Sequence, residues 1–211
     1  MSEPNKYQLI LLREATMHLE ETNVSPYLTL RYLLTKKPAG FQAEFRRIFE
    51  SYYGLNSGGL TEAFKNRYFD LLFGLEIQDH DDPHTRILAE LYEIPRRKGD
   101  KALQCSFVSK LVAIHDESYP IFDRHVSDFF GISVPSNWSL DFRIAGFMEN
   151  LKHLRNTYQC WSEDSEFQKI LLTLKQRHPY LNGCTTPRIA DFLVWTVGHN
   201  KLGSTPARAV K

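Results

Sequence analysis

The chain has 211 residues, 42% of them hydrophobic and 13% aromatic, which is enough for a packed core and too many for a disordered chain. Its 26 basic and 25 acidic residues leave a formal net charge of +1, so a uniformly basic nucleic-acid-binding surface is excluded and any basic surface has to be local. No apolar run approaches the roughly 18–20 residues of a membrane span and the N-terminus lacks a signal-peptide pattern, so we expect a cytoplasmic protein without membrane association.

Apolar residues recur at three- to four-residue spacing through most of the chain, the pattern of helices with one buried face. The stripes that predict helices cover residues 9–19, 41–52, 64–75, 88–92, 103–114, 144–154, 167–174 and 189–193. The expected helix starts are Ser25-Pro26, Thr61, Asp82-Pro83, Asp123, Ser139 and Thr186-Pro187, and the expected stops include Gly54, Gly131 and Gly198.

Strand-like alternation is confined to residues 132–134, and neither an internal repeat nor a long linker interrupts the chain. We therefore predict an all-α fold of about nine or ten helices in a single domain over residues 1–202. If that domain is built of two lobes, a cleft is expected near residues 95–130. The small, polar residues 203–211 predict a flexible tail.

Lys110 occupies an unusual position on the helix predicted over residues 103–114. At 100° per residue, it falls about 20° to one side of Leu103, whereas Phe107, Leu111 and Ile114 lie on the other side. A lysine beside an apolar arc either extends its stem along the edge of the core or lies in a pocket. In a pocket, desolvation lowers the pKa of the amine and produces the neutral nucleophile that Schiff-base chemistry needs.

Asp123 comes directly after the apolar run Pro120-Ile121-Phe122 and precedes a predicted short helix. An aspartate there caps the helix by accepting hydrogen bonds from its first amides. The same carboxylate, at the edge of a cleft, can orient or deprotonate a nucleophile. The two roles are compatible.

The segments SFVSKLVAIH and PIFDRHV together resemble the helix-hairpin-helix DNA glycosylase superfamily, whose members include the 8-oxoguanine DNA glycosylases. The resemblance covers about 30 residues: a lysine within a helix, a loop, and an Asp-x-His-Val opening to the next helix. Tyr52–Leu72 and Arg188–Gly198 are also similar to uncharacterised bacterial proteins with an oxoguanine-glycosylase-type fold.

The resemblance implies an all-helical DNA-binding protein that excises damaged bases from DNA and cleaves the resulting abasic site. Lys110 would attack the sugar C1′ of a flipped nucleotide, and Asp123 would activate the lysine or stabilise the developing sugar cation. Arg124 and His125, which follow the aspartate, would contact the DNA. No metal or organic cofactor is implied.

The superfamily's hairpin carries a Leu-Pro-Gly-Val-Gly-like turn whose amides hold a DNA phosphate, whereas here only Gly99 stands in the corresponding loop. The Lys110–Asp123 spacing is also shorter than in characterised members. Around the glycine, the loop carries four cations, at Arg96, Arg97, Lys98 and Lys101. Cations ahead of the lysine helix can contact phosphates through their side chains, although short charge runs are commonly solvated turns.

A metal-dependent phosphohydrolase is one alternative. Residues 78–84, with the sequence QDHDDPH, and His115-Asp116 supply the His-Asp pairs that such enzymes use as ligands. Adjacent Asp and His residues around Asp-Pro are also typical of a polar turn. The three cysteines (Cys105, Cys160 and Cys184) are widely spaced and predict neither a disulfide framework nor a structural zinc site.

The other alternative is a non-catalytic helical module that binds nucleic acid or protein. Exposed aromatic side chains could stack on bases. Trp138, in a loop before a predicted helix, is expected to be exposed, whereas Trp195 lies near the apolar stripe of the last helix and is expected in the core.

Overall fold

The part of the chain that the structure describes, residues 3–56, 59–77 and 82–203 of this computed structural model, is helical and contains no strand. This confirms the predicted all-α fold, with ten α-helices and one short 3-10 helix in those ranges. The helices are α1 (Lys6–His18), α2 (Glu21–Lys36), α3 (Phe41–Tyr52), α4 (Glu62–Gly74), α5 (Pro83–Tyr92), α6 (Cys105–His115), α7 (Arg124–Phe130), α8 (Leu140–Glu163), α9 (Ser165–Arg177), η1 (Pro179–Gly183) and α10 (Thr186–His199).

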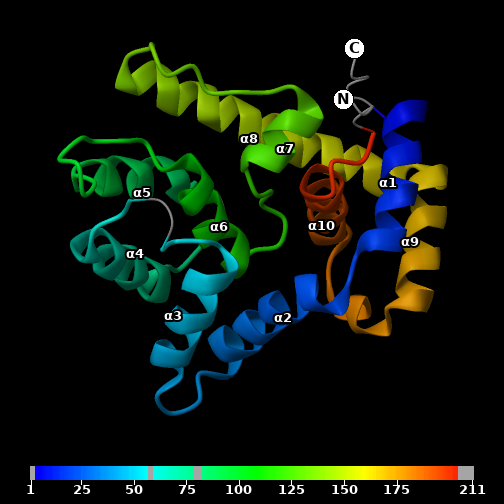
Figure 1. Ribbon diagram of the computed structural model, residues 1–211, viewed down its shortest axis with the longest axis horizontal. Coiled ribbons are helices and arrows are strands. Elements are labelled where there is room, and N and C mark those ends of the chain that lie inside the picture. Colours follow the sequence, from blue (N-terminus) through cyan, green and yellow to red (C-terminus); the bar gives the residue numbers. More distant parts are fainter. Residues whose placement is uncertain (1–2, 57–58, 78–81, 204–211) are drawn as a thin grey trace, which may run out of the picture.

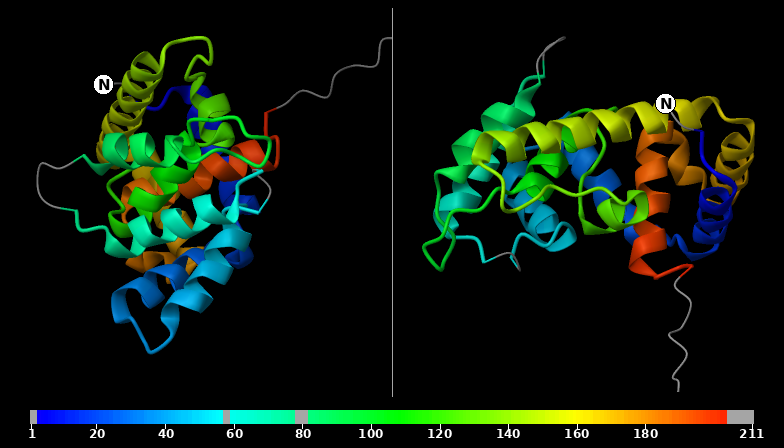
Figure 2. Two further views of the ribbon diagram at one scale, coloured as in Figure 1. Left: turned by 90° about the vertical axis from the view of Figure 1, so that its left-hand side faces the viewer. Right: turned by 90° about the horizontal axis from the view of Figure 1, so that it is seen from above.

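Helix α10 lies at the centre of the molecule and packs against α1, α7 and α8 (Figure 1). Figure 1 shows α3–α6 on one side of α10 and α1 with α9 on the other, and Figure 2 shows the long α8 running past both groups. From residue 188 to residue 197, every residue of α10 except Trp195 is buried. A helix that is apolar around most of its circumference belongs in the interior, which explains this central position.

Aromatic side chains pack the short α7 against α8, and α8 against α9. Phe129 and Phe130 at its end pack against Trp161 of α8, with ring centroids 6.2 and 5.6 Å apart. Trp161 in turn contacts Phe167 of α9 at 5.4 Å. Because α7 has only seven residues, these contacts rather than its own hydrogen bonds hold it in place.

Three of the expected helix caps are confirmed. The side chains of Thr61, Asp82 and Asp123 accept hydrogen bonds from backbone amides in the first turns of α4, α5 and α7, at 3.2, 3.1 and 3.1 Å. Gly131 ends α7 with a φ of 65°, a conformation that glycine adopts without steric cost. Local chemistry therefore fixes both ends of the helix that Asp123 begins.

The expected start of the second helix was wrong. Helix α2 begins at Glu21, and Pro26 lies inside it rather than at its first position. The side chain of Asn23 accepts a hydrogen bond from the backbone N–H of Glu20 at 3.0 Å, which supports an earlier start. Packing of the buried Val24 in the extra turn also favours the longer helix.

The last helix begins at Thr186 as expected but differs from expectation at its other end. Thr185 caps it, since its hydroxyl accepts a hydrogen bond from the amide of Arg188 at 3.4 Å. Gly198 does not stop the helix, which continues to His199. A Cβ at Gly198 would lie 2.6 Å from Cβ of His125, so this glycine permits the close approach of α7 and α10.

Within the described ranges, no helix combines the length and the apolar character needed to cross a membrane.

Replacing Gly198 with alanine is expected to destabilise the fold by about 1–3 kcal/mol, because α7 and α10 have to move apart to admit the methyl group. The midpoint of thermal unfolding, followed by circular dichroism, should fall by several degrees. Gly74→Ala is the matched control, since a Cβ there meets no atom within 4 Å. Equal midpoints for the two variants would contradict this account of the α7–α10 contact.

Candidate functional site

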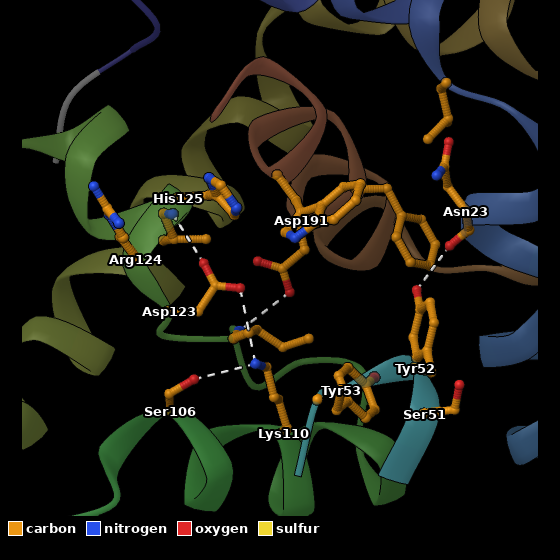
Figure 3. Close-up of a pocket in the computed structure, with 16 residues that line it drawn as sticks. Asn23, Ser51, Tyr52, Tyr53, Ser106, Lys110, Asp123, Arg124, His125 and Asp191 are labelled. Carbon is orange, nitrogen blue, oxygen red and sulfur yellow. Dashed lines mark hydrogen bonds and ion pairs between the residues drawn. The ribbon is translucent and has the colours of Figure 1, made fainter. Parts of the chain in front are cut away.

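A cavity of about 380 Å³ lies where the ends of α3 and α7 meet α6 and α10 (Figure 3). Its polar lining comes from segments far apart in the chain: Asn23, Ser51, Ser106, Lys110, Asp123, Arg124, His125 and Asp191. Tyr52, Tyr53, Phe192 and Trp195 add aromatic walls. The volume is within the range of about 300–1,000 Å³ that is typical of small-molecule sites.

Lys110 and Asp123, which the sequence predicts as a pair, meet in this cavity. The Lys110 Nζ atom lies 4.0 Å from Oδ2 of Asp123 and donates a hydrogen bond to Oγ of Ser106 at 3.1 Å (Figure 3). The two charged side chains are only 12% and 11% exposed. Of the two positions that the sequence left open for Lys110, the edge of the core or a pocket, the structure shows the pocket.

Desolvation dominates the chemistry of the Lys110 amine. Burial lowers the pKa of Lys110 from its ordinary value, and the Asp123 carboxylate raises it again by a smaller amount. The rings of Tyr53 and Phe107 lie 5.4 and 5.7 Å from Nζ and exclude water from it. A larger fraction of the amine is consequently neutral, and so nucleophilic, than in an exposed lysine.

Asp123 caps a helix and also faces the lysine. Its Oδ1 accepts a hydrogen bond from the amide of Val126 and caps α7, while its Oδ2 faces Lys110. The cap fixes the direction of the carboxylate, because the oxygen held by the helix determines where the other one points.

A second carboxylate in the lining, Asp191, was not identified from the sequence. It pairs with Arg188 one turn earlier on α10, with Nη1 and Oδ2 2.6 Å apart, and the two residues are 4% and 0% exposed. Burial raises the pKa of Asp191 to about 6, although the guanidinium opposes that shift. The available signal was an Arg and an Asp three residues apart within an apolar stripe.

The aromatic walls include a side chain that was expected in the core. Trp195 is only partly buried and lines the cavity. The His199 ring stacks on it, with centroids 4.4 Å apart and planes 12° apart, and the His125 ring meets it edge-on at 5.8 Å. Trp138, by contrast, is 50% exposed, as predicted.

Tyr52 closes the cavity towards α2, since its hydroxyl donates to the backbone carbonyl of Asn23 at 2.8 Å. Burial raises the pKa of Tyr52 and of Tyr53, so both side chains are neutral phenols at physiological pH. The aromatic part of the lining is therefore uncharged.

The predicted DNA-contacting residues fall into two groups. Arg124 and His125 line the cavity, and the Arg124 side chain is 89% exposed. The basic loop does not belong to this lining. It lies between α5 and α6, at the edge of the molecule away from α10 (Figure 1).

Most cations of the basic loop already have partners in the protein. Arg96 is ion-paired with Asp100, and Nζ of Lys101 lies 2.6 Å from a carboxylate oxygen of Glu93. Arg97 donates through Nε to the carbonyl of Leu60 at 3.0 Å. Lys98 is exposed, and Gly99 forms the turn with a φ of 83°. The phosphate-binding role of this loop stays a prediction.

Two further hollows adjoin the cavity along α7. One, of about 370 Å³, shares Ser106, Asp123 and Arg124 with it and also contains Arg143. The other, of about 620 Å³, shares Arg124 and His125 and also contains Lys201. Lys110 and Asp123 thus line a cavity that has two neighbouring hollows around the start of α7.

The residues of the metal alternative are only partly described, because residues 78–81 lie outside the described ranges. His84 is bonded through Nδ1 to Asp82 at 2.7 Å, and Nε2 of His115 lies 2.8 Å from the carbonyl of Leu72. The described residues contain no group of three or more His, Cys, Asp or Glu side chains arranged to hold a metal ion.

Comparisons of the chain with protein-family models, with curated proteins and with solved structures found no match.

Replacing Lys110 with methionine is expected to stabilise the protein by about 1 kcal/mol at pH 7, because the pKa of Lys110 is lowered even with Asp123 beside it, so the charged amine is unfavourable where it lies. The corresponding rise in the unfolding midpoint is about 2–4 °C. The folded-state pKa of Lys110 is lowered, so the unfolded chain binds this proton more readily and wild-type stability increases with pH up to about 10.4.

The advantage of Lys110→Met should therefore shrink as the pH of the melting experiment is raised from 7 towards 10. Lys98→Met, at an exposed position, is the control and should leave the midpoint unchanged at every pH. A destabilised Lys110→Met variant would show that the amine contributes net stability and would contradict the dominance of desolvation.

Proposed function

We propose that this protein is a DNA glycosylase with abasic-site lyase activity, acting on damaged bases. The observation that carries the proposal is the buried amine of Lys110, 4.0 Å from the carboxylate of Asp123, in an aromatic-walled cavity. An amine whose pKa burial lowers, beside a fixed carboxylate, is suited to forming a covalent bond with an electrophilic carbon.

In the proposed reaction, the neutral amine of Lys110 attacks C1′ of the damaged nucleotide. A nitrogen–carbon bond forms, the glycosidic bond breaks, and the base leaves with the bonding electron pair and takes up a proton. Asp123 stabilises the positive charge that develops on the sugar and accepts the proton that the alkylated amine loses. The nitrogen lone pair then forms a C=N bond as the C1′–O4′ bond breaks, and O4′ takes up a proton from water, which gives an iminium ion. Water removes a proton from C2′, and the electron pair of the resulting enamine expels the 3′ phosphate.

The dimensions of the cavity support a single extruded nucleotide as the substrate. A base inside a duplex cannot reach a buried lysine, so the nucleotide has to rotate out of the stack. The partly exposed ring of Trp195 and the uncharged rings of Tyr52, Tyr53 and Phe192 would then pack against the base.

The two neighbouring hollows support a polymeric substrate. A free nucleoside would need only the cavity that holds Lys110, whereas a DNA strand continues beyond the reacting nucleotide. Arg143 in one hollow, Lys201 in the other and the exposed Arg124, whose Nε lies 3.6 Å from a carboxylate oxygen of Asp128, would face its phosphates. This cationic path is local, as the near-neutral net charge requires.

A non-catalytic nucleic-acid-binding module is the second candidate. It is favoured by Trp138 and Phe142, which are 50% and 67% exposed and whose ring centroids lie 6.4 Å apart. Two neighbouring exposed rings could stack on unpaired bases. Replacement of Lys110 would not weaken nucleic-acid binding by such a module.

Borohydride trapping with duplex DNA that contains 8-oxoguanine or an abasic site distinguishes the two candidates. Wild-type protein is expected to form a covalent adduct, visible as a shifted band on a denaturing gel, because borohydride reduces the iminium ion to a stable amine. Lys110→Ala should form none, and the Lys98→Ala control should match wild type.

An adduct that survives in Lys110→Ala would contradict the assignment of the nucleophile. Absence of an adduct from wild type on both substrates, with DNA binding retained, would favour the binding module.

Asp123→Asn is expected to slow single-turnover trapping by about 10²- to 10³-fold, the range measured when one group that stabilises transition-state charge is removed. Asparagine caps helices as well as aspartate does, so α7 should remain formed. Because the carboxylate raises the pKa of Lys110, its removal should also shift the rising limb of the pH–rate profile to lower pH.

Asp164→Asn, at the cap of α9, is the matched control and should change neither the rate nor the profile. If Asp123→Asn reacts more slowly but the rising limb of its pH–rate profile stays at the wild-type pH, the carboxylate does not act on the Lys110 amine.

A further inference from the structure

The loop between α6 and α7, residues 116–123, determines how far Asp123 lies from Lys110. Lys110 and Asp123 are only 13 positions apart in the sequence. Lys110 lies within α6, and Asp123 is the last residue of the loop, directly before α7. An irregular segment of this length has many conformations, so the 4.0 Å separation of the charged groups has to be imposed by contacts from elsewhere.

Three side chains hold the backbone of this loop directly. Nη2 of Arg188 donates to the carbonyl of Tyr119 at 3.1 Å, and Oδ2 of Asp191 accepts from the amide of Ile121 at 3.2 Å. Oγ of Ser109 accepts from the amide of Phe122 at 2.9 Å. These hydrogen bonds therefore hold residues 119, 121 and 122, just before Asp123.

The same groups also bind the lysine helix. Nη2 of Arg188 donates to the carbonyl of Ala113 at 3.2 Å, in the last turn of α6, and Ser109 is the residue that precedes Lys110. A single guanidinium on α10 thus contacts both the helix that carries the amine and the loop that carries the carboxylate.

The other end of the loop is fixed by Glu117. Its carboxylate accepts from the hydroxyl of Tyr27 at 2.6 Å and from the amide of Thr185 at 2.8 Å. The Arg188 guanidinium lies over the Tyr27 ring, 5.3 Å from its centroid. The start of α10, the loop and α2 are therefore joined in one buried polar network.

A buried ion pair is a costly way to fill the interior, since apolar residues of similar volume are often equally or more stabilising. The Arg188–Asp191 pair differs from apolar packing in that its four hydrogen bonds have fixed directions. Its contribution is therefore to geometry more than to net stability.

We propose that Arg188 and Asp191 are positioning residues, which hold the α6–α7 loop so that the Asp123 carboxylate faces the Lys110 amine at reacting distance. The proposal rests on the function proposed above. Neither residue takes part in the bond changes. Because a displacement of about 1 Å can cost 10²-fold in rate, loss of one tether is expected to slow the chemical step by about 10- to 100-fold.

The test compares Asp191→Asn and Ser109→Ala with wild type in single-turnover trapping on abasic duplex, and measures DNA affinity separately. Asp191→Asn removes the charge of the pair, and Ser109→Ala removes the Phe122 tether without touching the pair, which protects the test against a variant that fails to fold. Leu193→Ala is the control for general destabilisation, since Leu193 is fully buried in α10 and makes none of these hydrogen bonds.

The proposal predicts that the trapping rate falls at least tenfold in Asp191→Asn, and by a smaller factor in Ser109→Ala, while the Kd for DNA changes by less than about threefold. Leu193→Ala should keep the wild-type rate. Rates that are unchanged, or that fall equally in the Leu193→Ala control, would overturn it.

A readout without DNA separates this proposal from the function on which it rests. If wild-type protein forms no adduct, the proposed function fails, and amide hydrogen exchange at Val126 then reports the tether alone, because that amide is bonded to Asp123. Faster exchange in Asp191→Asn and Ser109→Ala than in Leu193→Ala would support the positioning role. Equal exchange in all three variants would overturn it.

Discussion

Desolvation of one amine is the constraint on which the rest of the site depends. Lys110 has lost most of its contact with water, and a single carboxylate, that of Asp123, compensates for part of the loss. The balance matters in both directions. A closer or stronger partner would keep the amine protonated, whereas no partner would leave a buried cation without compensation. The surrounding helices hold the pair at a separation between these extremes.

Helix α10 contributes to this arrangement because it contacts α6, α7 and the loop between them. Gly198 lets it approach α7, Trp195 and Phe192 form a wall of the cavity, and Arg188 with Asp191 binds the loop ahead of Asp123. A central helix packed on several sides is among the least mobile parts of a fold, and a site supported by it is correspondingly well ordered. In the proposed reaction, the amine lies on α6 and the carboxylate directly before α7, and α10 positions the two groups.

The comparison with the sequence separates local from tertiary determinants. The caps at Thr61, Asp82 and Asp123 could be predicted because they depend on residues within one turn. The sequence placed Lys110 beside the apolar arc of its helix, but the choice between a pocket and the edge of the core depends on neighbouring helices and stayed open. The helix start predicted at Ser25-Pro26 was wrong, because packing of the preceding residues outweighed the preference of proline for the first turn of a helix. The Arg188–Asp191 tether and the helical Gly198 could not be foreseen, because both depend on contacts with segments about 70 residues away. The charges of the Arg96–Lys101 loop pair locally, which a count of cations does not reveal.

The most direct measurement is the identification of the amine that becomes attached to DNA. Wild-type protein would be reduced with borohydride in the presence of an abasic duplex, digested with nuclease and protease, and the modified peptide sequenced by mass spectrometry. The account predicts that the sugar remnant is on Lys110. A remnant on Lys98 or Lys101, or on the N-terminal amine, would show that an exposed amine reacted adventitiously and would contradict the central role of the buried lysine.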